Sequence, residues 1–168
     1  MDNQIKKCVF EMFSDRNYNY NPNIDFKKDF YEIFDFDKKK YLLKFVLSDI
    51  KGSQIKEIIK IFLAELKEEI DNIEKIYVVI KSTFNYSFPK VEVLNSKFFK
   101  CNITKHSMSP PHELVNEHEL ERLTEKGIKN LPIIFESDPM VRWYGWKAGQ
   151  ICKITRATSN YFRLIINK

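Results

Sequence analysis

Features that define several common protein classes are scarce in this sequence. It has only four glycines and six prolines in 168 residues, which argues against a disordered or fibrous chain. Its three cysteines, Cys8, Cys101 and Cys152, are far apart and form no Cys-x-x-Cys pair. The sequence therefore indicates neither a zinc knuckle nor a disulfide framework, and we expect three buried thiols in a reducing compartment.

Long apolar runs are also missing. The N-terminus lacks the apolar segment of a secretory signal, and no run approaches the ~18 apolar residues of a membrane-spanning helix. The sequence predicts neither secretion nor a membrane partner. The length and the 43% share of hydrophobic residues suit one domain or two small ones.

The motifs of catalytic and metal-binding sites are absent or incomplete. His112 and His118 each neighbour a glutamate, but they lie six residues apart and do not match the H-E-x-x-H spacing. The segment 48–53 has one glycine and no Walker or dinucleotide-binding pattern, and no serine or cysteine lies in a nucleophile elbow. We expect no metal, no cofactor and no small-molecule substrate.

A nuclease is the enzymatic alternative, because βαβ-like cores can hold carboxylates and a lysine around Mg²⁺. Asp49, Glu57 and Lys81 are the candidate residues. However, Glu57 lies one turn into a predicted helix, and the second predicted strand carries no acidic-x-lysine pair. We therefore expect a chain without catalytic residues of its own.

Hydrophobic spacing predicts a small α/β domain in residues 1–89. A strand, a long helix and a second strand follow one another at the spacing of a βαβ unit. A preceding helix would place Phe26, Phe30 and Ile33 or Phe34 on one apolar face. The predicted elements are helices over residues 2–14, from Asn23 and from Ser53 through Ile70, and strands over residues 41–47 and 76–80.

Residues 90–168 predict an α+β domain with a small mixed sheet. Asn116 and Glu119 form a capping box that opens a short helix with Leu120 and Leu123 turned inward. Residues 91–94 and 98–103 are expected to form short strands or, alternatively, a linker strand into the C-terminal domain. Further strands are expected over residues 151–156 and 161–166.

Residues 138–156, DPMVRWYGWKAGQICKITR, carry the strongest local signals. Asp138 and Pro139 are typical of a helix N-cap and first helical position. Gly145 can end this short helix in the left-handed conformation, and Gly149 can take a positive φ in the turn that follows.

Charge also divides the chain. Residues 1–89 carry equal numbers of basic and acidic side chains, so residues 90–168 hold the whole net charge of +5. Trp143, Tyr144 and Trp146 lie among the basic residues, and aromatic residues with arginine are enriched in protein interfaces. The same mixture can stack single-stranded bases, so the composition favours a protein partner but leaves nucleic acid open. After Asp138 the only charged residues are Arg142, Lys147, Lys153, Arg156, Arg163 and Lys168.

Residues 131–156 closely resemble the signature of the small assembly subunit of multisubunit DNA-directed RNA polymerases. This family comprises a short archaeal subunit and the eukaryotic subunit 5, which the nuclear polymerases share. Residues 102–106 are similar to the family's entry into this domain, and residues 10–18 to the first-helix end of the eukaryotic subunit, with Asn17 where glycine is usual. The matching positions are Leu131-Pro132, Asp138-Pro139, Arg142, Tyr144-Gly145, Lys147, Gly149-Gln150 and Ile154-Thr155-Arg156.

The resemblance implies a non-catalytic role in transcription. The C-terminal domain of such a subunit docks on the largest polymerase subunit, and a jaw-like N-terminal domain lies beside downstream duplex DNA, with peripheral contact. A free-standing nucleic-acid-binding protein is the alternative. The implied interface residues are Asp138, Pro139, Arg142, Tyr144, Gly145, Lys147, Gly149, Gln150 and Arg156.

The resemblance also bears on the source of the chain. The archaeal members of the family lack the N-terminal domain, so the chain is similar to the subunit of a eukaryote or of a large DNA virus. The region after Ile80 is abbreviated, and Ala157-Thr158-Ser159 replaces the usual Pro-Ser-Glu, which favours a virus. The expected location is the nucleus for a cellular protein, and the virion and host cytoplasm for a viral one.

Overall fold

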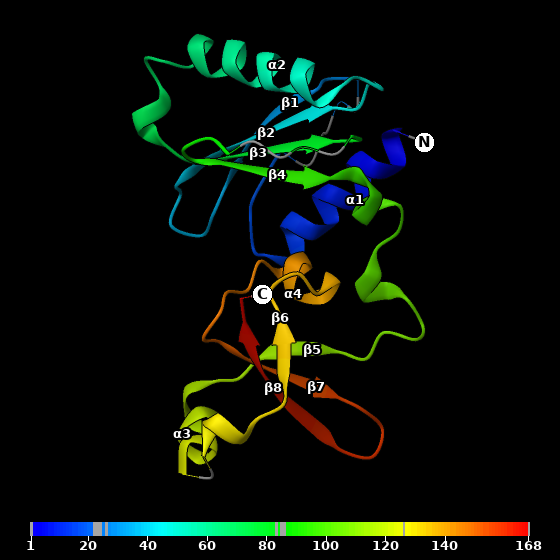
Figure 1. Ribbon diagram of the computed structural model, residues 1–168, viewed down its shortest axis with the longest axis vertical. Coiled ribbons are helices and arrows are strands. Elements are labelled where there is room, and N and C mark those ends of the chain that lie inside the picture. The colour runs from blue at the N-terminus through cyan, green and yellow to red at the C-terminus, as the bar shows by residue number, and fades with distance from the viewer. Residues whose placement is uncertain are drawn as a thin grey trace. The chain divides into compact units, whose positions relative to one another are not determined.

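The computed structural model describes residues 2–21, 25, 27–82, 84, 87–125 and 127–167. The chain divides into two compact units, Met1–Cys101 (unit 1) and Asn102–Lys168 (unit 2) (Figure 1). The predicted boundary between residues 89 and 90 differs from this division because the strand at 91–95 pairs within the first sheet. Within the described residues, no helix is long and apolar enough to span a membrane.

Unit 1 is built around a four-stranded mixed sheet in the order β1-β2-β3-β4. β1 and β2 form an antiparallel hairpin, whereas β2 pairs parallel with β3 and β3 parallel with β4. The predicted strand–helix–strand unit is observed as β2, α2 and β3. The elements are α1 Asp2–Asp15, β1 Phe30–Phe34, β2 Lys40–Val46, α2 Gly52–Glu65, the 3-10 helix Ile70–Asn72, β3 Ile73–Ile80, β4 Val91–Asn95 and the 3-10 helix Ser96–Phe99.

The two helices of unit 1 cover opposite faces of this sheet (Figure 1). Ile55 and Ile59 of α2 pack with Leu42 and Val78 in one buried cluster. On the other side, Phe13 of α1 is fully buried, with its ring in edge contact with Tyr77 of β3. Because both faces are covered, β3 is apolar on both, as expected for a central parallel strand.

The helix predicted from Asn23 is wrong over residues 30–34, which form β1. Phe30 and Ile33 are spaced as on a helix face, but the backbone pairs with β2 from Phe30–Lys44 to Phe34–Lys40. Hairpin pairing therefore overrides the local periodicity. Asn23 and Phe26 lie outside the described residues.

Two further boundaries differ from the prediction. Helix α2 ends at Glu65 and does not reach Ile70. The strand expected over residues 98–103 is wrong, because the 3-10 helices Ser96–Phe99 and Ile103–Lys105 overlap the two ends of this segment. The side chains of Asn95 and Asn102 accept hydrogen bonds that start these turns, and such local side-chain bonds compete with strand pairing.

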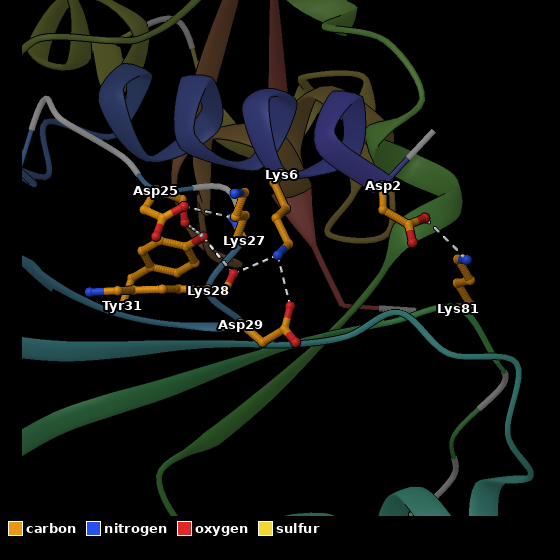
Figure 2. A network of polar contacts seen from close by, with 8 residues as sticks. All are labelled: Asp2, Lys6, Asp25, Lys27, Lys28, Asp29, Tyr31 and Lys81. Carbon is orange, nitrogen blue, oxygen red and sulfur yellow. Dashed lines mark hydrogen bonds and ion pairs between the residues drawn. The ribbon is translucent and has the colours of Figure 1, made fainter.

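A buried lysine links α1 to the segment before β1 (Figure 2). Lys6 is only 4% exposed, and its ammonium lies 2.7 Å from Asp29 Oδ1 and 2.5 Å from the Lys28 carbonyl. The Tyr31 hydroxyl donates to the same carbonyl at 2.6 Å. Burial, together with the nearby charges of Asp29 and Asp25, raises the pKa of Tyr31 to about 12.

Unit 2 contains a smaller mixed sheet in the order β5-β7-β8-β6. Its pairs are antiparallel except β6 with β8, as expected for the predicted mixed sheet. The elements are the 3-10 helix Ile103–Lys105, β5 His112–Leu114, α3 Glu117–Glu125, the 3-10 helix Ile128–Asn130, β6 Ile133–Phe135, α4 Pro139–Tyr144, β7 Ile151–Thr155 and β8 Asn160–Ile166.

The buried cluster of unit 2 is small. Val141 of α4 packs on Cys152, Ile154 and Ile165, which lie on one face of the sheet. On α3, the Asn116 side chain accepts from the Glu119 amide at 2.9 Å, which confirms the predicted cap. The expectation that Leu120 turns inward is wrong, because this side chain is 40% exposed.

Candidate docking surface around helix α4

The local signals around α4 fold as the sequence predicts. Asp138 is the N-cap, and its side chain accepts a hydrogen bond from the Met140 amide at 2.8 Å, while Pro139 occupies the first turn. Gly145 ends the helix in the left-handed conformation with φ 72°. These two ends confine α4 to six residues.

Hydrogen bonds from side chains and from the β8 backbone fix the turn after α4. The Lys147 amide donates to Gln150 Oε1 at 2.6 Å, and the Ala148 amide donates to Glu136 Oε1. Gly149 takes φ 89°, and its amide donates to the Ile165 carbonyl of β8 at 2.9 Å. A Cβ at Gly149 would have open space, so the positive φ is what favours glycine here.

The three aromatic residues of this segment have different environments. Trp143 is only 3% exposed and belongs to the interior, so the expectation that it contributes to a surface is wrong. Tyr144 and Trp146 are half-buried, and their rings stack with centroids 4.6 Å apart at 12°. Gly145 lies between them, so the left-handed turn brings the two rings together.

The basic residues differ as well. Lys153 lies 2.9 Å from both Glu119 and Glu113, and these bonds raise the pKa of Lys153. This lysine therefore clamps α3 and β5 to β7. Arg163 donates to the Ile133 carbonyl at 3.1 Å, which ties β8 to β6. Lys168 lies outside the described part of the chain.

Eight of the nine predicted interface residues lie in one continuous segment of helix and turn, from Asp138 to Gln150. Arg156 does not join them. Gln150 precedes β7 and Arg156 follows it, so about 20 Å of strand separates the two. The guanidinium of Arg156 lies over the Tyr161 ring, 5.5 Å from its centroid.

Two of the three candidate nuclease residues form ion pairs with other side chains. Lys81 pairs with Asp2 at 3.1 Å, as Figure 2 shows, and Glu57 pairs with Lys60 on the surface of α2. In the part of the chain that the structure describes, no three His, Cys, Asp or Glu side chains are arranged to hold a metal ion. His112 Nδ1 lies 2.7 Å from the Pro110 carbonyl, which gives this histidine a structural contact.

The cysteines match the expectation in part. Cys8 and Cys152 are buried, and burial raises the pKa of the Cys152 thiol. Cys101 is exposed at the end of unit 1, so its predicted burial is wrong.

Sequence reasoning missed three contributors to this unit: Glu136, the Glu113–Lys153 pair and Tyr161. Glu113 lies opposite Lys153 only in the antiparallel register of β5 and β7. Tyr161 reaches Arg156 only because a tight turn joins β7 to β8. No local pattern carries either signal, since both depend on strand register.

Comparison with known proteins places unit 2 in a family. Residues 101–165 match the family described as RNA polymerase Rpb5, C-terminal domain. DNA-directed RNA polymerase subunit Rpo5 of Methanococcus vannielii is 40% identical over 73 residues, which are 39% of this chain and 94% of that protein. The chain therefore belongs to the RNA polymerase subunit 5 family, which includes eukaryotic Rpb5 and archaeal Rpo5.

Plant relatives extend the similarity towards unit 1. DNA-directed RNA polymerase V subunit 5A of Arabidopsis thaliana is 30% identical over 132 residues, which are 71% of this chain and 57% of that protein. DNA-directed RNA polymerases IV and V subunit 5B of the same plant is 37% identical over 79 residues, which are 45% of this chain and 36% of that protein. The matched regions thus span well under two thirds of either plant protein.

Proposed function

We propose that this chain is a non-catalytic subunit of a DNA-dependent RNA polymerase and docks on the largest subunit through unit 2. One observation carries the proposal: the family match at residues 101–165 coincides with unit 2, Asn102–Lys168. The match to the archaeal relative is about as long as unit 2 and covers 94% of that protein. Unit 2 thus corresponds in size to a complete polymerase subunit.

The segment from Asp138 to Gln150 is the proposed docking surface. Its backbone is fixed by the Asp138 cap, the left-handed Gly145 and the hydrogen bonds of the turn. A fixed surface loses little conformational entropy when a partner binds. Tyr144 and Arg142 supply an aromatic ring and a guanidinium, which are the side chains that most often dominate binding energy.

Unit 1 has a different proposed role, as the jaw beside downstream duplex DNA. Its residues up to 89 carry equal numbers of acidic and basic side chains. Without a basic surplus, contact with DNA phosphates would be weak and peripheral.

The second candidate function is a free-standing nucleic-acid-binding protein. The basic surplus of residues 90–168 is the observation that favours it. The internal contacts of Lys153 and Arg163 leave fewer cations for phosphates. Sub-micromolar binding of the isolated chain to duplex DNA with a steep salt dependence would support this function, because each phosphate contact releases counterions. We expect weak, salt-sensitive binding at most.

The source and location of the chain are part of the proposal. The abbreviated region after Ile80 and the Ala157-Thr158-Ser159 replacement favour a large DNA virus, with the protein in the virion and host cytoplasm. A cellular protein of this family would instead act in the nucleus.

Native co-purification with the polymerase tests the proposed docking. Arg142→Ala and Tyr144→Ala should each lower recovery of the largest subunit by ~10-fold or more, as expected of residues that dominate an interface. Arg122→Ala on the exposed surface of α3 is the matched control and should retain wild-type recovery. Wild-type recovery with both α4 variants, at unchanged circular dichroism, would contradict the interface.

A further inference from the structure

The turn that joins β7 to β8 lies outside the continuous docking segment proposed above. It holds residues 156–159, between the paired residues Thr155 and Asn160, and forms the end of the β7–β8 hairpin (Figure 1). The Arg156 amide donates to the Ser159 carbonyl at 3.0 Å and closes the turn. All four residues of the turn are exposed. Exposed loop tips of this kind are the parts of a folded chain that modifying enzymes reach most readily.

Ser159 presents a hydroxyl that the fold does not use. Within the part of the chain that the structure describes, no hydrogen bond engages this hydroxyl. The exposed Thr124 of α3 differs, because its hydroxyl donates to the Leu120 carbonyl at 2.8 Å. A serine hydroxyl can donate one hydrogen bond and accept others, so modification of Ser159 removes no internal contact that holds the unit together.

The sequence around Ser159 has the spacing that arginine-directed protein kinases select. These kinases modify a serine or threonine that follows an arginine by three residues, because carboxylates of the kinase pair with the guanidinium. The chain has five arginines, and only Arg156 precedes a serine or threonine by three positions. The exposed turn and the arginine spacing are independent observations that indicate the same hydroxyl.

The charges of the hairpin favour a phosphate at this position. No acidic residue follows Asp138 in the sequence, so no side chain of β7, the turn or β8 would repel a phosphate. A phosphoserine carries about −1.5 to −2 charges at pH 7 and forms charge-assisted hydrogen bonds with arginine. The hydrogen bond that closes the turn keeps the backbones of Arg156 and Ser159 together. Phosphorylation would therefore change the charge of the turn from +1 to about −0.5 to −1.

We infer that Ser159 is a phosphorylation site and that its phosphate pairs with Arg156. In the transfer, Ser159 Oγ forms a bond to the γ-phosphorus of ATP as the bond to ADP breaks, and the hydroxyl proton passes to a base of the kinase. Without the phosphate, the Arg156 guanidinium lies 5.5 Å from the centroid of the Tyr161 ring. The phosphate offers this guanidinium a stronger, charged partner. The inference concerns the chain itself and does not depend on the proposed docking.

Phosphorylation of the full, folded chain tests the site. A purified serine/threonine kinase that selects arginine three residues before its target is incubated with the chain and ATP, and mass spectrometry locates the phosphate. Ser159 should be the main site, and Ser159→Ala should abolish this modification. Arg156→Gln should lower the initial rate by ~10-fold or more, because the kinase loses its charged contact. Arg122→Gln, the matched loss of an exposed arginine on α3, should leave the rate unchanged.

Tryptophan fluorescence checks that each variant is folded, because both tryptophans lie in unit 2. A phosphate mainly on another residue, modification only after denaturation in urea, or equal rates for Arg156→Gln and Arg122→Gln would overturn the phosphorylation site.

The pairing with Arg156 has a separate measurement. Phosphoserine is incorporated genetically in place of Ser159, and phosphorus NMR follows its titration in the full chain. The second pKa of the phosphate should be lower with Arg156 than in the Arg156→Gln variant, because the guanidinium favours the dianion. Arg122→Gln should not change this pKa. Equal pKa values with and without Arg156 would overturn the pairing.

Discussion

The two units of this chain achieve stability in different ways. In unit 1, α1 and α2 cover both faces of the sheet, and the fully buried side chains include Phe13, Leu42 and Ile76. In unit 2, the buried cluster is small, and Ile133, Phe135 and Tyr161 are exposed on the strands. Unit 1 also exposes large apolar side chains, Phe34, Phe36, Ile61 and Phe98, so exposure alone does not distinguish the two units. The difference between the units lies in their cores: unit 1 buries a larger apolar cluster than unit 2.

Truncation of a buried side chain should have the largest effect, and it should destabilise only the unit that contains the side chain. Phe13→Ala in unit 1 should cost ~3–5 kcal/mol of unfolding free energy, and Ile165→Ala in unit 2 should cost ~2–5 kcal/mol. Both tryptophans, Trp143 and Trp146, lie in unit 2, so their fluorescence follows unit 2 alone, whereas circular dichroism follows both units. Denaturation of Ile165→Ala should shift the fluorescence transition. If Phe13→Ala shifts the fluorescence transition as much as Ile165→Ala does, the two units unfold together, and the comparison of two independently stable units is wrong.

The buried Lys6 predicts an asymmetry between the two partners of its ion pair. Asp29→Ala should destabilise unit 1 by ~1–3 kcal/mol, because it removes a carboxylate that compensates a buried charge. Lys6→Met removes the charge but keeps most of the apolar stem, so it should cost less. Urea denaturation followed by circular dichroism measures both. A larger loss for Lys6→Met would contradict this account of the network.

The α4 cap predicts an effect confined to unit 2. Asp138→Ala should lower stability by ~1 kcal/mol, the usual cost of an N-cap, whereas Asp138→Asn should retain most of the stability because asparagine also caps well. The tryptophan transition is the measurement, since Trp143 lies on α4. Equal losses for the two variants would assign the effect to the charge of Asp138 and not to the cap.

The clamp between Lys153 and Glu119 predicts the smallest effect, a dependence on pH. The bond to Lys153 lowers the pKa of Glu119, so the stability it contributes is present above the ordinary glutamate pKa and is lost as pH falls through the lowered value. The raised pKa of Lys153 adds a loss as pH rises through that value. Glu119→Gln should reduce the loss of unit 2 stability at acid pH, as followed by the tryptophan fluorescence transition. If the loss of stability at acid pH is unchanged, the Glu119–Lys153 pair does not contribute to it.

Local sequence signals were sufficient where one segment determines its own structure. The ends of α4 follow from Asp138, Pro139 and Gly145, and β3 follows from an apolar run bounded by charge. The strand β1 could not be predicted, since the spacing of Phe30 and Ile33 suits a helix equally well. Only its pairing with β2 decides between the two structures.

The candidate site shows the same limit. The segment from Asp138 to Gln150 was predicted because its caps and turns are local. The ion pair between Lys153 and Glu119 and the contact of Arg156 with the Tyr161 ring were not, because each joins two different elements or segments of unit 2. Side chains that meet through register leave no pattern in a single sequence.

Site-specific photocrosslinking in the native polymerase tests the central claim most directly. A photoreactive amino acid would replace Tyr144 in unit 2 or, in a second variant, the exposed Ile61 on α2 of unit 1. The account predicts a crosslink from position 144 to the largest polymerase subunit and none to that subunit from position 61. A crosslink to the largest subunit from position 61, with none from position 144, would contradict it.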